Sequence, residues 1–130
     1  MIAAMLLMLS QTGAATAADI HGEWVNKGAT AIIRIADCPT GLCGTVIWST
    51  PKAQSDAARG GTAELNGTVV MSGFVPASER RWRGRLFLPD QNRMVRVAIE
   101  LRGANELRVK GCELGGLVCR SQTWTRRSAG

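Results

Sequence analysis

The fold is decided by two stretches, Gly22-Glu23-Trp24 near the start of the chain and Gln122-Thr123-Trp124-Thr125-Arg126 near its end. The first is typical of an opening β-strand whose Trp24 points into a core, and the second of a closing strand. A guanidinium from Arg126, or from Arg127 instead, can lie over the Trp24 ring, a contact that contributes about 0.5–2 kcal/mol. A sheet whose first and last strands pair has no free edge. We therefore expect Gly22, Trp24, Trp124 and Arg126 to close a barrel.

Between these stretches the sequence consists of short alternating segments separated by residues that favour turns. In the clearest segment, Trp82 and Leu86 alternate with Arg83 and Arg85, which is the period of a strand with one face in the core. Eight such segments close around an interior that side chains nearly fill or that holds one small ligand. We predict an all-β fold, a small eight-stranded antiparallel up-and-down barrel, with strands at residues 21–26, 30–35, 43–48, 68–74, 82–88, 94–101, 106–110 and 119–126.

Composition is that of a single folded domain with a basic surface. The chain has 130 residues, 45% of them hydrophobic, and a formal net charge of +6. A length of this order corresponds to one domain. The positive charge favours anionic partners, but it does not choose among phosphates, acidic glycans, lipid head groups and nucleic acid.

The first 18 residues have the pattern of a secretory signal peptide. An apolar run from Met1 to Leu9 is followed by small residues at positions 14–18, although no Lys or Arg precedes the run. The run is shorter than the roughly 20 residues that a spanning helix needs. The alternative is a short buried helix. We expect residues 1–18 to be a signal peptide, residues 19–130 to be one β-barrel domain, and the protein to be periplasmic or secreted.

Four cysteines, an even number, agree with export. Of the three pairings that four cysteines allow, the two local ones are favoured because each closes a loop rich in turn residues. A zinc site formed by the same thiolates is the alternative, at unusual spacings. The Cys-x-x-Cys spacing of redox catalysts does not occur. We expect disulfides between Cys38 and Cys43 and between Cys112 and Cys119, with no metal and no cofactor.

The pattern Gly22-x-Trp24 with a terminal Trp-x-Arg resembles the lipocalin and calycin signature. A fuller resemblance, over nearly the whole mature chain, is to a bacterial exported family catalogued as domain of unknown function 2147. The resemblance implies a lipocalin-like β-barrel in the envelope or outside the cell, and no established activity. The chain departs from the family at residues 57–61 and at Phe87, Leu88 and Val95. The matching residues are Gly22, Trp24, Ile35, Cys38, Leu42-Cys43-Gly44, Trp48, Asp56, Gly67, Gly73-Phe74, Trp82-Arg83-Gly84, Pro89, Gly111-Cys112 and Cys119-Arg120-Ser121-Gln122-Thr123-Trp124-Thr125-Arg126.

Four residues are candidates for a ligand site. Trp48 and Trp82 border long connections and either lie at a pocket mouth or belong to the core. Asp56 lies in residues 49–66, which we expect to be the longest connection without a helix, and it is either a ligand contact or an exposed turn residue. Gln122 is in phase with Trp124, so its amide is expected to point inward, where it needs hydrogen-bond partners.

The sequence favours a binding protein over an enzyme. His21 is the single histidine, and the acidic residues are scattered, so no catalytic triad or acid–base pair is indicated. The basic segment around Trp82 does not indicate nucleic-acid binding, because strand alternation puts the ring opposite Arg83 and Arg85. We expect a non-catalytic envelope module for a small apolar or amphipathic ligand. The alternatives are a basic surface that binds anionic envelope glycans or lipids and, less favoured, an enzyme with a site near Asp56.

Overall fold

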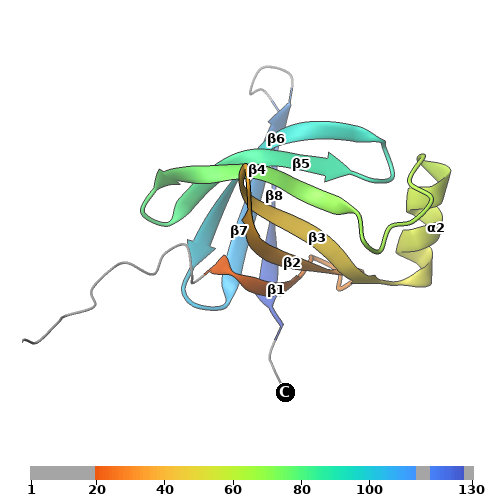
Figure 1. Cartoon of the computed structure of the whole chain (residues 1–130), viewed down its shortest axis with the longest axis horizontal. Helices are drawn as coiled ribbons and strands as arrows, with labels where there is room; N and C mark the ends of the chain where they lie inside the picture. Colours follow the sequence, from red (N-terminus) through yellow and green to blue (C-terminus); the bar gives the residue numbers. More distant parts are fainter. Residues whose placement is uncertain (1–19, 114–117, 128–130) are drawn as a thin grey trace, which may run out of the picture.

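The computed structural model describes residues 20–113 and 118–127 of the chain (Figure 1). Eight strands and a helix follow one another along these residues. They are β1 (Gly22–Val25), β2 (Ala31–Cys38), β3 (Gly41–Ser49), α2 (Pro51–Arg59), β4 (Val69–Ser78), β5 (Arg81–Leu88), β6 (Arg93–Arg102), β7 (Glu106–Glu113) and β8 (Val118–Arg126). The signal peptide predicted for residues 1–18 lies outside the described residues. None of the described helices is long and apolar enough to cross a bilayer.

The strands form a closed barrel, as predicted. Each strand pairs antiparallel with the next along the chain, and β1 also pairs with β8. At this last seam Trp24 lies opposite Arg126, and the amide of Arg127 donates to the carbonyl of Glu23 at 2.9 Å. Closure therefore gives β1 and β8, the two strands that would otherwise be edges, a partner on both sides.

One end of the barrel is filled by large apolar side chains. Strand alternation turns every second side chain inward, so Trp82 at the start of β5 is only 1% exposed. Trp24 is fully buried, and its indole Nε1 donates to the carbonyl of Ile20 at 2.9 Å. Unfilled space is therefore left to the opposite end of the barrel. The packed end also contains Ile35, Leu42, Phe74, Ile99, Leu101 and Leu107.

Helix α2 corrects the prediction that residues 49–66 hold no helix. The side chain of Thr50 caps the helix by accepting from Ala53 N at 3.1 Å, and Pro51 occupies the first turn, where its missing N–H costs nothing. The side chain that the helix buries fully is Ala57. Because alanine supplies no large apolar row, the segment lacks the three–four spacing by which amphipathic helices are recognised.

Helix α2 lies beside the end of the barrel at which β5 turns into β6 (Figure 1). The hydroxyl of Thr62, just after the helix, donates to the carbonyl of Pro89 in the β5–β6 turn at 2.9 Å. Gly60 packs so closely on this turn that an added Cβ would lie 2.0 Å from the carbonyl oxygen of Asp90. These contacts hold the helix next to the unfilled end of the barrel.

The two local disulfides favoured by the sequence are confirmed. The strands run further into the expected loops than predicted, because β2 and β3 are joined only by residues 39 and 40 and β4 continues to Ser78. Cys112 and Cys119 are directly opposed partners in the β7–β8 ladder. Both disulfides therefore link cysteines that lie on paired strands.

Candidate functional site

A cavity of about 530 Å³ occupies the end of the barrel beside α2. Its inner wall is apolar because inward-facing positions of five strands meet there, and α2 adds two alanines as a cover. Trp124, which is 4% exposed, forms part of this wall. The apolar lining consists of Ala31, Ile33, Val46, Ala53, Ala57, Leu65, Val70, Leu86, Phe87, Leu88, Pro89 and Trp124.

A second space of about 540 Å³ extends along β5 to β8. It shares Lys27, Leu86, Leu88 and Gln122 with the first cavity, so the two are adjoining halves of one interior. The apolar wall of this half is formed by Val95, Val97, Val109 and Val118. Each half is of the size that small-molecule sites commonly have, roughly 300–1,000 Å³.

Charge is distributed unevenly around the rim of this interior. The half along β5 to β8 is lined by Lys27, Arg93 and Arg120, and by no carboxylate of the described residues. The half beside α2 is lined by Lys52 as well as by Asp56 and Asp90. The first half therefore attracts an anionic group, whereas the second is closer to neutral.

The turn between β1 and β2, which carries Lys27, is held by the side chain of Asn26. Its Oδ1 accepts from the backbone amides of Thr30 and Ala31, both at 2.9 Å. Its Nδ2 donates to the hydroxyl of Thr30 at 2.9 Å. Such side-chain bonds to nearby backbone groups stabilise a turn in one conformation. The backbone that carries Lys27 is therefore preorganised at the rim.

Gln122 lines both halves of the interior, in phase with Trp124 as the sequence predicts. Its Oε1 accepts from Trp124 Nε1 at 2.8 Å. The glutamine itself is largely exposed, because it stands at the open side of the cavity. It thus satisfies the indole of a wall residue and presents its amide to the space in which a ligand would lie.

Asp56 is carried by α2 and lines the half of the cavity beside the helix. Lys52 Nζ lies 2.9 Å from its Oδ2, and Arg59 pairs with Oδ1. The hydrogen bond from Lys52, followed by the charges of Lys52 and Arg59, lowers the pKa of Asp56 despite some desolvation. Asp56 is therefore an ion-paired carboxylate at neutral pH, and not a proton donor.

The other two predicted tryptophans do not line this cavity. Trp48 is 46% exposed, on the outside of β3. Trp82 is 1% exposed and lies in the packed end of the barrel. The sequence does not predict Ala53 and Ala57 as lining residues, and the signal that points to them is the Thr50-Pro51 helix start that precedes them.

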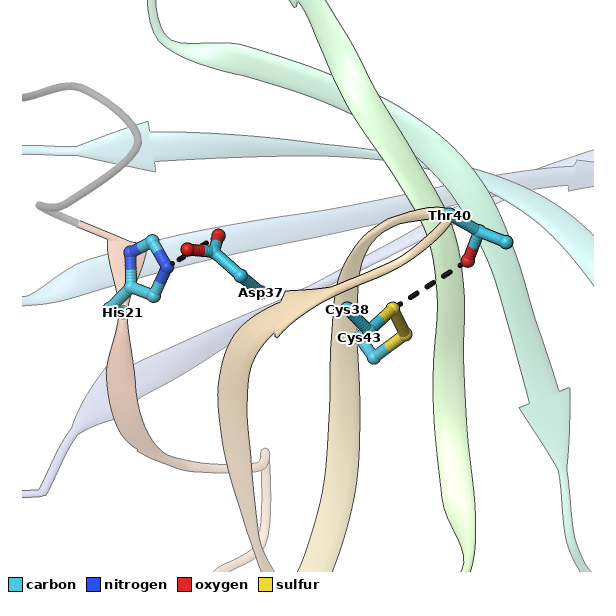
Figure 2. Close-up of a disulfide and its surroundings, with 5 residues drawn as sticks. All are labelled: His21, Asp37, Cys38, Thr40 and Cys43. Carbon is cyan, nitrogen blue, oxygen red and sulfur yellow. Dashed lines mark hydrogen bonds and ion pairs between the residues drawn. A yellow bond between two sulfur atoms is a disulfide. The ribbon is translucent and has the colours of Figure 1, made fainter.

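His21 forms a pair with Asp37 that resembles two members of a catalytic triad. Its Nε2 lies 2.8 Å from Asp37 Oδ1, and the Cys38–Cys43 disulfide is close by (Figure 2). Sulfurs bonded to one another offer no thiolate for nucleophilic attack. Asp37 is largely exposed, so the pair lacks the enclosed surroundings that strengthen electrostatic catalysis. Within residues 20–113 and 118–127 no cluster of metal-ligating side chains occurs.

Comparisons with known proteins place this barrel in a family. The chain matches the family model described as "Uncharacterized protein conserved in bacteria (DUF2147)" over residues 22–126. Its structure is similar to a solved chain described as "Protein HP1028 from the human pathogen Helicobacter pylori belongs to the lipocalin family", with a TM-score of 0.64 and 11% identity over 85% of this chain and 84% of that chain. At this identity the likeness shows the fold alone. A search of curated proteins finds no match. The family model covers most of the chain, which therefore belongs to the DUF2147 family of uncharacterized bacterial proteins.

Proposed function

We propose that this protein is a non-catalytic binding module that takes an amphipathic small molecule with an anionic end into its barrel. The observation that carries the proposal is the contrast, within one interior, between an apolar wall and a positively charged rim. Leu86, Val97 and Val109 form an apolar wall, whereas Lys27 and Arg120 stand at the rim with no carboxylate of the described residues beside them. An apolar tail is stabilised by about 0.8 kcal/mol for each CH₂ that it buries, and the cations attract an anionic head.

The chemistry of the described residues supports binding over catalysis. Asp56 is neutralised by Lys52 and Arg59, and the pair of His21 and Asp37 lacks a thiolate beside it. A general acid at neutral pH needs a raised pKa, whereas the pKa of Asp56 is lowered. We infer that the cavity holds its ligand without transforming it.

The two disulfides support a location outside the cytoplasm, in the periplasm or beyond the cell. Disulfides persist in oxidising compartments and are rare where thiols are kept reduced. Export also agrees with the signal peptide expected from residues 1–18. We place the module in the cell envelope or the surrounding medium on these grounds.

Mass spectrometry of the gently purified protein under native conditions tests whether it retains a small molecule. Calorimetric titration with dodecanoate and with dodecan-1-ol then tests the anionic end. We expect dodecanoate to bind more tightly, and the double variant Lys27→Gln with Arg120→Gln to abolish this preference while leaving dodecan-1-ol binding nearly unchanged. Equal binding of acid and alcohol by the unaltered protein would show that the rim does not select charge.

A matched pair of tryptophan substitutions tests the site itself. Leu86→Trp adds bulk where the two halves of the interior meet, whereas Val75→Trp adds the same ring at a position that is 50% exposed. We expect the first to abolish binding of dodecanoate and the second to leave it unchanged, with folding of both checked by circular dichroism. Binding that survives Leu86→Trp would place the ligand elsewhere.

The alternative expected from the sequence, contact with anionic lipids or glycans, concerns the outer face of β5 to β7 and not this cavity.

A further inference from the structure

The outer face of β5, β6 and β7 carries an unusual concentration of positive charge. Alternation along β5 turns Arg83 and Arg85 outward, opposite to Leu86. The strand register places Arg85 directly opposite Arg96 on β6. It also aligns Arg83 with Ala98 and then with Lys110 on β7. All four charged side chains are exposed.

These four residues and Arg81 line one concave surface, which we call the outer basic groove, with a volume of about 940 Å³. Its floor is formed by small residues, among them Ser72, Gly73, Gly84 and Ala98. Gly84 is required by the core beneath the groove, because an added Cβ would point inward and lie 2.5 Å from the ring of Phe74. No carboxylate of the described residues lines the groove.

Four of the five cations that line the outer basic groove have no carboxylate partner among the described residues. The neighbouring acid is Glu100, whose Oε2 accepts from Arg81 Nε at 2.9 Å and whose Oε1 lies 3.7 Å from Arg102. In the described part of the chain, Arg83, Arg85, Arg96 and Lys110 form no ion pair. Like charges placed directly opposite one another across two strands destabilise a sheet. The arrangement of Arg85 against Arg96 therefore has a cost in stability that folding alone does not require.

We propose that the outer basic groove binds a ligand that carries two or more phosphate groups. Guanidinium groups donate two parallel hydrogen bonds to phosphate oxygens, and a concave basic surface concentrates the positive potential. Four cations that have no ion-pair partner among the described residues exceed what a single carboxylate would neutralise. No aromatic side chain of the described residues lines the groove, so it lacks the stacking surface on which proteins hold nucleobases. The groove is separate from the barrel cavity, and the inference does not depend on the function proposed for that cavity.

Calorimetric titration of the unaltered protein with inorganic tripolyphosphate and with orthophosphate tests the proposal. We expect tripolyphosphate to bind at least about tenfold more tightly, because it bridges several cations, and its affinity to fall as salt concentration rises. The double variant Arg85→Gln with Arg96→Gln should lose at least about tenfold in affinity, since hydrogen bonds to charged groups contribute strongly. Both substituted side chains are exposed, so this double variant should keep the circular dichroism spectrum of the barrel.

The matched control is the double variant Arg34→Gln with Arg59→Gln, which removes the same charge from exposed positions outside the groove. We expect its affinity for tripolyphosphate to change by less than about threefold. Equal losses in the two double variants, or no binding of tripolyphosphate by the unaltered protein, would overturn the proposal. The variant Leu86→Trp should bind tripolyphosphate normally, which separates this site from the barrel cavity.

Vesicles identify the source of the phosphate groups. Phosphatidylcholine vesicles that contain a bisphosphorylated glucosamine lipid are compared with vesicles that contain an equal charge of phosphatidylglycerol, by co-sedimentation. Preferential binding to the first, reversed by Arg85→Gln with Arg96→Gln, assigns the groove to a phosphorylated glycolipid head group. Binding of soluble tripolyphosphate without either vesicle assigns it to a soluble phosphorylated ligand. If both double variants bind both kinds of vesicle equally, binding depends on net charge alone, and the outer basic groove is not a specific site.

Discussion

The guanidinium carbon of Arg126 lies 4.4 Å from the centroid of the Trp24 ring, across the seam at which β8 meets β1. Arg126 Nη1 also donates to the carbonyl of His21, and its Nε to the carbonyl of Ala104, both at 2.9 Å. One side chain thus covers the buried indole and ties two backbone segments together. The seam that closes the barrel is therefore held by the side chain of Arg126 as well as by the pairing of β1 with β8.

Arg126→Ala is expected to destabilise the barrel by about 2–4 kcal/mol, because it removes a cation–π contact and two charged hydrogen bonds that are not fully additive. Urea unfolding followed by tryptophan fluorescence measures the change. The control is Arg34→Ala, which removes an exposed guanidinium paired with Glu23 and should have a much smaller effect. Similar losses in the two variants would contradict a special role for Arg126.

Gly22→Ala is expected to cost more stability than Gly103→Ala. Gly22 has φ of 128°, and an added Cβ would lie 3.1 Å from Arg126 Nη1. Gly103 has φ of 68°, with no atom within 4 Å of the added Cβ, so it isolates the backbone cost of about 1–2 kcal/mol. Thermal unfolding measures both. A smaller loss at Gly22 would show that the seam accommodates a side chain there.

Thr50→Ala is expected to destabilise α2 by about 1 kcal/mol, because Ala53 N loses its capping partner. Hydrogen exchange should quicken in α2 while the strand amides stay protected, since the helix buries little. Ser55→Ala within the same helix should slow exchange slightly, because alanine is the better helix former. Faster exchange in the strands would show that α2 and the barrel unfold as one unit.

Acid is expected to destabilise the protein as carboxylates in ion pairs become protonated. Hydrogen bonds from Arg34 and Arg127 lower the pKa of Glu23, and the hydrogen bond from Arg81, the largest cause, lowers the pKa of Glu100. A lowered pKa in the folded state adds stability above the unfolded value of about 4, and this stability is lost as pH falls below it. Urea unfolding between pH 6 and pH 3 measures the loss. The loss of stability on acidification should be smaller in Glu23→Gln. A loss of the same size as in the unaltered protein would show that Glu23 does not contribute to it.

Arg96→Glu is expected to stabilise the barrel by about 0.5 kcal/mol while it abolishes binding of tripolyphosphate. The substitution turns the opposition of Arg85 and Arg96 into an attraction. Arg108→Glu should instead destabilise the barrel, because Arg108 lies opposite Glu100 and the substitution places two carboxylates against one another. Thermal unfolding at low salt measures both changes. Destabilisation by Arg96→Glu would show that the two arginines do not repel one another.

The sequence alone determines the strands and their two faces, because alternation depends only on neighbouring residues. The alternation of Trp82 and Leu86 with Arg83 and Arg85 predicts both the core and the basic face. Closure could also be predicted, since Trp24 and Arg126 are residue types that favour a contact between the first and last strands. Helix α2 escaped prediction because it buries alanine, which leaves no apolar period to detect.

The tertiary structure alone decides which end of the barrel is filled and which is open. Trp82 and Trp124 are both buried, yet only Trp124 lines the cavity, and no local pattern distinguishes them. The rim brings Lys27 together with Arg120, and the outer basic groove brings Arg85 together with Arg96. Such neighbours arise from the register between strands, which is set by the packing of the whole barrel. Local sequence patterns therefore predict the strands, but not which charges meet.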